Sequence, residues 1–242
     1  MYLNILFVCC THGDEPIGKY VFDNYLSGKN KYYSWQSIIA NFKALKSNRR
    51  FIDIDLNRVF PGKQNGKYEE KRAYEINKIL PKFHLVIDWH QSNNLMNDII
   101  FVSRLNPFTK KICQYFAINH IVELDIGNQD YKGLLIFQVE NSIAVEYANG
   151  AGTNNIYHRA NRDITNLLNK RVVYLNKIYY RLFGYVSLKF KRQIKLENFK
   201  KLTDKELKTL NIKKENIYPI FVNTYPHIYC VLLSENNKYS TI

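Results

Sequence analysis

Cysteine is scarce in this sequence, and the four cysteines that occur form no framework. Cys9 and Cys10 are adjacent, while Cys113 and Cys230 stand alone. Such spacing fits neither the disulfide set of a small secreted protein nor the Cys-x-x-Cys pairs of a structural zinc site. A zinc site built from thiolates is therefore not expected, and we expect Cys9 and Cys10 to be small buried residues.

Long apolar runs are also missing. No stretch approaches the length of a membrane span, and the opening Met1-Tyr2-Leu3-Asn4 lacks the basic segment of a signal peptide. Internal repeats and low-complexity tracts are absent as well. These features predict a cytoplasmic protein that begins at Met1 and has no membrane partner.

Acidic residues are outnumbered, 21 against 35 basic ones, which leaves a formal net charge of +14. A charge of this size can indicate nucleic-acid binding. The lysines are scattered along the chain, however, and a positive field would equally attract a small anionic substrate. We therefore expect no nucleic-acid partner, and a non-enzymatic basic module that binds nucleic acid is the least favoured alternative.

Short apolar segments alternate with helical patterns in a chain of 242 residues whose 46% hydrophobic content can form a sizeable core. The expected strands lie at 3–10, 37–41, 83–89, 99–103 and 143–147. Helices are expected at 16–26, 68–80 and 106–117. This alternation predicts an α/β fold with a mostly parallel (mixed) central sheet flanked by helices.

The pattern changes after residue 157. A long helical pattern covers 157–183 and is stopped by Gly184, and strands are expected at 185–196 and 218–233. Between them, Thr203-Asp204-Lys205-Glu206 has the form of a capping box at the start of a short helix. We therefore expect a catalytic domain at 1–185 and a small β-rich C-terminal domain at 186–242.

Polar side chains follow three of the expected strands at the point where each strand ends. The first strand leads into His12 and Glu15, another ends at His90, and a third at Glu146. The carboxyl ends of strands in open α/β sheets form the ligand-binding edge, so these groups can converge.

Two histidines and one carboxylate with an open fourth position form a catalytic type of zinc site. Asp88 could then orient a ligating histidine from behind, and Glu146 could serve as the general base. Taken singly, each residue has an ordinary alternative: a surface turn, a packed histidine or a lysine-paired glutamate. Their joint position at the strand ends favours the metal site.

Several motifs occur in an order that covers nearly the whole chain. They are Thr-His-Gly-Asp-Glu at 11–15, Asn-Phe-Lys-Ala at 41–44, Arg-x-x-Asp-x-Asp-Leu-Asn-Arg-Val-Phe-Pro-Gly at 50–62, the strand ends at 86–90 and 143–146, and Tyr-Pro-Ile-Phe-Val-Asn at 218–223. In these motifs the sequence resembles the aspartoacylase and succinylglutamate desuccinylase family, which has a zinc carboxypeptidase-like fold.

The resemblance implies a role for each matched position. His12, Glu15 and His90 would bind one zinc ion per chain, and Glu146 would activate water. Arg50 would stabilise the oxyanion of the tetrahedral intermediate. Asn57 and Arg58 would hold the carboxylate of the substrate, since a guanidinium pairs with a carboxylate through two hydrogen bonds.

The chain also departs from the family pattern. Cys9 and Cys10 stand where the family usually has glycines. The arginine that reads a second substrate carboxylate in aspartoacylases is missing, and only Lys132 is a candidate for its place. Tyr225 or Tyr229 could take the place of the C-terminal tyrosine that closes on the substrate.

These observations predict a zinc-dependent hydrolase that cleaves the non-peptide amide bond of an N-acyl amino acid or a related small carboxylate-bearing amide. A carboxypeptidase-like hydrolase acting on a peptide or peptide-like conjugate is the nearest alternative. The sequence does not determine the oligomeric state, and a homo-oligomer is possible.

Overall fold

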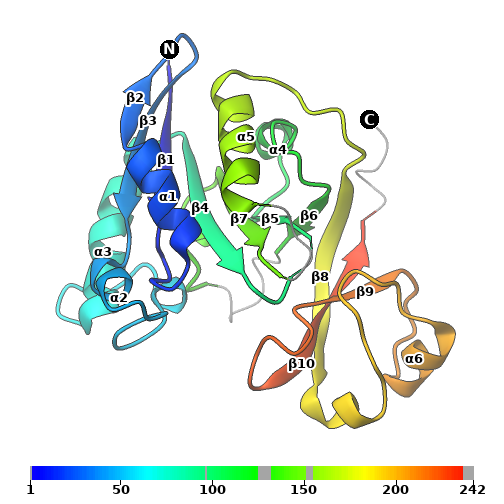
Figure 1. The fold of residues 1–242 in the computed structure, drawn as a ribbon. Coiled ribbons are helices and arrows are strands. Elements are labelled where there is room, and N and C mark those ends of the chain that lie inside the picture. The colour runs from blue at the N-terminus through cyan, green and yellow to red at the C-terminus, as the bar shows by residue number, and fades with distance from the viewer. Residues whose placement is uncertain (1, 96, 125–131, 151–154, 237–242) are drawn as a thin grey trace.

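The computed structural model describes residues 2–95, 97–124, 132–150 and 155–236, through which one ten-stranded sheet runs (Figure 1). The strand order is β2-β3-β1-β4-β7-β5-β6-β8-β10-β9. The strands are β1 (Leu3–Cys9), β2 (Ser27–Lys29), β3 (Tyr33–Ile39), β4 (Leu85–Ser92), β5 (Ile99–Val102), β6 (His120–Glu123), β7 (Ser142–Ala148), β8 (Ile178–Ser187), β9 (Ile217–Ile220) and β10 (Ile228–Glu235).

The sheet is mixed, as expected. β3, β1, β4 and β7 are parallel neighbours, whereas β5 runs antiparallel to β7. β6 is parallel to β5 and β8, and the β8-β10-β9 end is antiparallel. The parallel centre brings the carboxyl ends of β1, β4 and β7 to one edge, where β-strands of this kind present their ligand-binding residues.

Helices cover both faces of the sheet. Alternate residues of β1 point to opposite faces. Ile5 and Phe7 pack with the helices α1 (Pro16–Asn24), α4 (Pro107–Cys113) and α5 (Ile156–Leu168), while Leu6 and Val8 pack with α3 (Tyr68–Ile79). The remaining α-helices are the short α2 (Phe42–Lys46) and α6 (Asp204–Thr209). In the part of the chain that the structure describes, no helix is long and apolar enough to cross a membrane.

The prediction of one long helix over 157–183 is wrong beyond residue 168. α5 ends at Leu168, Lys170 takes a left-handed φ of 53°, and β8 contains Gly184 well inside the strand. The segment after α5 is rich in Val, Ile and Tyr, which favour strands over helices. Its strand state is stabilised by antiparallel pairing with β10, some 50 residues further along the chain.

The strand predicted at 185–196 is correspondingly short, because β8 ends at Ser187 and a 3₁₀ turn follows at Leu188–Arg192. The strand predicted at 218–233 is two strands, β9 and β10, joined by a turn. The capping box of α6 is confirmed, since Thr203 Oγ1 accepts a hydrogen bond from Glu206 N. β2 and β6 were not expected.

The C-terminal part forms a lobe below the helices of the main body in Figure 1. It has its own apolar core, which includes Val186, Leu196, Leu207 and Cys230. β8 itself runs across the predicted boundary at 185/186 and joins the lobe to the main sheet. The division into two domains stays a prediction.

Candidate active site

The turn after β1 is shaped by an unusual backbone conformation at Cys10. This residue has a φ of 56°, in the left-handed region that favours glycine. It stands at a position where the family named above usually has a glycine. Gly18 of α1 approaches closely, since a Cβ there would lie 2.3 Å from Cys10 N. The turn carrying His12 and Glu15 is therefore held directly against α1. As expected, Cys9 and Cys10 are buried; Cys113 and Cys230 are buried as well, and all four are free thiols.

The three residues predicted as metal ligands lie together. His12, Glu15 and His90 are buried, and one potential ligand atom from each lies within 4.8 Å of the others. Both imidazole rings turn Nδ1 toward Glu15: His12 Nδ1 lies 2.5 Å from Oε1, and His90 Nδ1 lies 2.8 Å from Oε2. The side chains thus present two ring nitrogens and one carboxylate to a common point.

The other nitrogen of each ring faces a second carboxylate. His12 Nε2 lies 3.1 Å from Asp55 Oδ1, and His90 Nε2 lies 2.8 Å from Asp88 Oδ2. Thr11 Oγ1 in turn donates to Asp88 Oδ1 at 2.7 Å. Carboxylates placed this way fix the orientation and the tautomer of metal-binding histidines. The role predicted for Asp88 agrees with this contact, but Asp55 and Thr11 were missed, although both stand within the quoted motifs.

The electrostatics of the group favour a cation. Burial disfavours a charged imidazole, yet Glu15 and Asp55 outweigh burial and raise the pKa of His12; Asp88 and Glu15 raise that of His90 in the same way. Burial would raise the pKa of Glu15, but the two imidazoles hold it far below its usual value. Three carboxylates around two imidazoles, with a His₂Glu donor set at the centre, fit a catalytic zinc ion.

Glu146 lies on β7 directly beside His90, with which it is paired in the parallel register. Ala144 and Ala148 share its face of the strand, and Ile99 is its antiparallel neighbour on β5. In this apolar setting, burial and then the charge of Glu15 raise the pKa of Glu146 to about 7. A carboxyl group poised near neutral pH can both accept and donate a proton.

Arg50 stands against the same group with 41% of its side chain exposed. Its Nη2 lies 2.9 Å from His12 Nε2 and 3.3 Å from Asp55 Oδ2, and its Nη1 lies 3.4 Å from Glu15 Oε1. Burial would lower the pKa of Arg50, but Asp55 and Glu15 outweigh it and raise the pKa. The guanidinium is thus a permanent forked cation beside the metal-ligand group.

A buried carboxylate holds the segment that follows Arg50. Glu69, in the first turn of α3, is fully buried. Its Oε1 accepts from Ile52 N at 2.7 Å, and its Oε2 accepts from Asp53 N at 3.0 Å and Ile54 N at 3.3 Å. These hydrogen bonds fix the backbone between Arg50 and Asp55. Glu69 was also missed, because its partners are recognisable only once the segment has folded over α3.

Asn57 and Arg58 follow in a 3₁₀ turn, but they differ in exposure. Arg58 is exposed, and its Nη1 donates to Asn57 O at 2.7 Å. Asn57 Oδ1 accepts from Leu135 N at 2.9 Å. Lys132 is exposed nearby, next to Gly133, whose backbone packs on that of Arg58. Three of the four predicted substrate-binding residues, Asn57, Arg58 and Lys132, therefore lie in adjoining segments.

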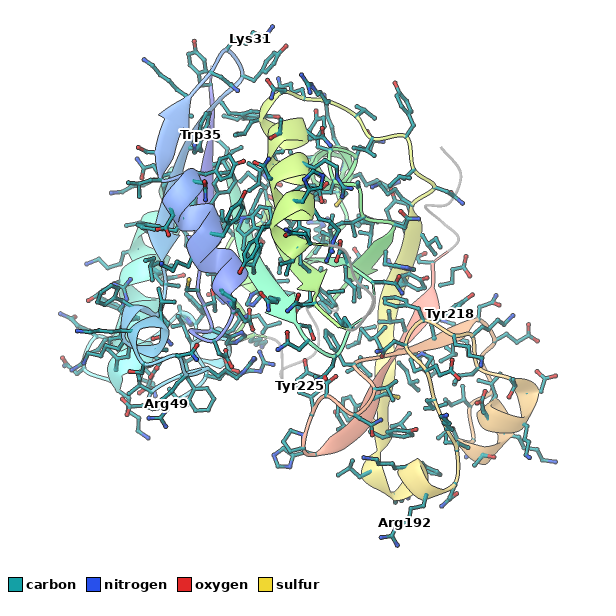
Figure 2. All side chains as sticks on the ribbon, in the orientation of Figure 1. Lys31, Trp35, Arg49, Arg192, Tyr218 and Tyr225 are labelled. Carbon is teal, nitrogen blue, oxygen red and sulfur yellow. The ribbon has the colours of Figure 1, made fainter. Side chains whose placement is uncertain are left out.

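The two candidate tyrosines occupy different places. Tyr229 is buried, and its hydroxyl donates to Ile194 O at 3.1 Å and accepts from Leu196 N at 3.0 Å. Tyr225 is half-buried, and it is close enough to Arg50 for its phenol to help raise the pKa of that guanidinium, after Asp55 and Glu15. Figure 2 shows Tyr225 between the main body and the C-terminal lobe. The geometry therefore favours Tyr225 as the tyrosine of the site.

Known proteins resemble this chain in sequence. The succinylglutamate desuccinylase/aspartoacylase catalytic domain matches residues 2–145. A probable aspartoacylase from Trichodesmium erythraeum is 32% identical in an alignment 123 residues long, which covers 44% of this chain and 41% of that protein. An N-acyl-aromatic-L-amino acid amidohydrolase (carboxylate-forming) from Rattus norvegicus is 31% identical in an alignment 128 residues long, which covers 46% of this chain and 40% of that protein. The matches thus span less than half the length of these relatives.

Solved structures resemble nearly the whole chain in fold. Succinylglutamate desuccinylase from Chromobacterium violaceum has a TM-score of 0.74 at 18% identity, covering 97% of this chain and 85% of its own. Murine aminoacylase 3 has a TM-score of 0.72 at 18% identity, covering 97% of this chain and 95% of its own. With the matched catalytic domain extending over more than half of the sequence, the chain belongs to the succinylglutamate desuccinylase/aspartoacylase family.

Proposed function

We propose that this protein is a zinc-dependent amidohydrolase that cleaves an N-acyl amino acid or a related small amide into a carboxylate and an amine. The observation that carries the proposal is the convergence of His12, Glu15 and His90 on one point, with Glu146 beside His90. The family relatives include aspartoacylases and an N-acyl-aromatic-L-amino acid amidohydrolase, which supports this class of substrate.

His12 Nδ1, His90 Nδ1 and the carboxylate of Glu15 would hold the zinc ion. Bound there, zinc would act as a Lewis acid toward the amide carbonyl and lower the pKa of a water molecule. Asp55 and Asp88 hold the Nε2 side of the two rings, so that both Nδ1 atoms are left to bind the ion. Glu146 accepts a proton from the attacking water and later donates it to the leaving amine, so one carboxyl group serves both halves of the reaction.

The two arginines interact with different negatively charged groups of the substrate. Arg50 lies against the ligand group and stabilises the negative charge that develops on the carbonyl oxygen. Arg58 is exposed in the 3₁₀ turn that follows Asp55, and it binds the substrate carboxylate together with the Nδ2 of Asn57. Tyr225 closes the site from the side of the C-terminal lobe, and Lys132 offers a further positive charge near Arg58.

The acyl amino acid itself is best identified by turnover. A panel should contain N-acetyl-aspartate, an N-succinyl amino acid, N-acetyl-tyrosine and short peptides with a free carboxylate. Faster hydrolysis of acyl amino acids than of peptides supports the proposal. Faster peptide cleavage would instead favour the carboxypeptidase-like alternative.

Metal content by mass spectrometry, on wild type and His90→Ala prepared side by side, tests the metal centre independently of the substrate. About one zinc per chain in the wild type and its loss in the variant are expected. Failure of both proteins to take up zinc, even after zinc is added, would remove the hydrolase proposal.

A further inference from the structure

One side chain outside the site joins two segments that meet at it. Asn198 lies in the connection that leads to α6 and is half-buried. Its Nδ2 donates to Asn94 O at 3.1 Å, and its Oδ1 accepts from Val222 N at 2.9 Å. The carboxamide therefore uses its donor toward one segment and its acceptor toward the other.

The first of these segments is the loop that follows the ligand His90. This loop contains Asn94 and begins directly after Gln91 and Ser92, the last two residues of β4. Gln91 N donates to Glu15 Oε2 at 3.2 Å. Asn149 N, just after β7, donates to Ser92 O at 2.8 Å. The strand end from which the loop leaves is thus bonded to a predicted metal ligand and to the residue that follows the strand of Glu146, so a displacement of the loop would change the geometry of the reacting groups.

The second segment is the turn after β9, which carries Tyr225. Phe221 and Asn223 have left-handed φ values of 53° and 58°, on either side of Val222. Non-glycine residues in this region are strained and persist only where surrounding contacts hold them. The hydrogen bond from Val222 N to Asn198 is such a contact. Tyr225 then packs edge-on against Phe221, with ring centroids 5.6 Å apart.

We infer that Asn198 is a positioning residue for substrate binding: it holds the turn that carries Tyr225 in register with the loop that follows His90. The inference rests on the proposed function, because it assigns to Tyr225 a contact with the substrate. Asn198 itself touches neither the ligand group nor Glu146 in any contact of the described residues. Its effect is therefore on the affinity for substrate, with the metal centre and the proton transfer left intact.

Two substitutions separate the two hydrogen bonds of Asn198. Asn198→Ala removes both. Asn198→Asp keeps an acceptor for Val222 N but sets a carboxylate oxygen against Asn94 O. Each variant should raise KM about five- to tenfold, which corresponds to the free energy of about one hydrogen bond. The value of kcat should stay within about twofold, and the zinc content should be unchanged. Asn176→Ala, at an exposed asparagine in the connection between α5 and β8, is the control and should leave KM unchanged.

A double-mutant cycle with Tyr225→Phe distinguishes positioning from general loosening. If Asn198 acts through Tyr225, the increase in KM caused by Tyr225→Phe in the wild type should be largely lost in the Asn198→Ala background. Additive effects on KM would overturn the inference. So would a lower melting temperature in Asn198→Ala with KM unchanged.

Amide hydrogen exchange provides a readout that does not depend on activity. In Asn198→Ala, exchange should accelerate at Val222 and also at Gln91, in the end of β4 that leads into the other segment. In Asn198→Asp, Val222 should stay protected while Gln91 accelerates. Acceleration confined to Val222 in both variants would overturn the inference. A wild-type protein that hydrolyses no acyl amino acid would refute the proposed function alone, since the exchange experiment tests the coupling of the two segments separately.

Discussion

Asp55 Oδ1 lies 3.1 Å from Nε2 of His12, on the opposite side of the imidazole ring from Glu15. In the proposed site this carboxylate would accept the Nε2 proton, which would leave Nδ1 to bind the metal ion. We expect Asp55→Asn to weaken zinc binding about 10- to 100-fold, as is usual when such an orienting carboxylate is removed. Competition of the zinc-loaded protein against a chelator of known affinity measures the change.

Asp53→Asn is the matched control, two residues away on the same segment. Asp53 Oδ2 accepts a hydrogen bond from Tyr68 N at 3.2 Å, and Asp53 makes no described contact with the histidines. An equal loss of zinc affinity in both variants would show that the segment as a whole, rather than the bond to His12, maintains the site.

Glu146→Gln should separate metal binding from catalysis. The amide is nearly isosteric with the carboxylate but cannot take up the water proton, so turnover should fall by about 10² to 10⁴ while zinc content stays near one per chain. Steady-state kinetics and metal analysis on the same preparation check this. A variant with near-normal turnover would mean that another group is the base.

The pH profile should report the same residue. Burial, and then the charge of Glu15, raises the pKa of Glu146 to about 7, and a bound cation would move this pKa downward. Because the base must be ionised to accept a proton, kcat/KM should rise with pH through an apparent pKa at or below about 7. An acid limb centred above pH 8 would contradict the assignment.

The sequence was sufficient to predict that the two histidines and the two glutamates at the strand ends lie close together. His12, Glu15, His90 and Glu146 each follow an apolar run, and parallel neighbours carry their carboxyl ends to one edge, so local pattern and topology determine their convergence. Asp55 and Glu69 have no such signal. Their roles depend on how the segment 50–58 folds over α3, which is set by contacts between distant parts of the chain.

The same distinction explains the error at the end of the main body. The amphipathic pattern of α5 is real as far as Leu168, but the residues beyond it form β8 because a strand is available for pairing in β10. Likewise, spacing alone could not choose between Tyr225 and Tyr229. The hydrogen bonds of the Tyr229 hydroxyl with the backbone of Ile194 and Leu196 occupy that group and favour Tyr225.

Arg50 and Arg58 should affect different kinetic constants. Arg58→Ala removes the exposed guanidinium that we propose binds the substrate carboxylate both before and during the reaction, so KM should rise about tenfold or more with a small change in kcat. Arg50→Ala should lower kcat about 10²- to 10³-fold, because the oxyanion forms only along the reaction. Arg50→Lys keeps the charge but not the fork, and should recover only part of the rate. Similar kcat values for Arg50→Ala and wild type would remove the role assigned to Arg50.

His120 provides a test of stability away from the site. Its ring stacks on Phe199 with centroids 4.0 Å apart, its Nδ1 lies 3.2 Å from the Tyr180 hydroxyl, and burial lowers its pKa to about 4. Between pH 6.5 and 4, therefore, His120 is protonated in the unfolded chain but stays neutral in the folded protein. The neutral ring contributes stability that is present above pH 6.5 and is lost as the pH falls through this window. In His120→Phe, which keeps a ring against Phe199 and cannot titrate, the free energy of unfolding should fall about 3 kcal/mol less between pH 7 and 4 than in the wild type. Urea titrations at several pH values measure the difference, in which the carboxylates common to both proteins cancel. Parallel pH profiles for the two proteins would show that His120 is protonated as readily in the folded state as in the unfolded chain.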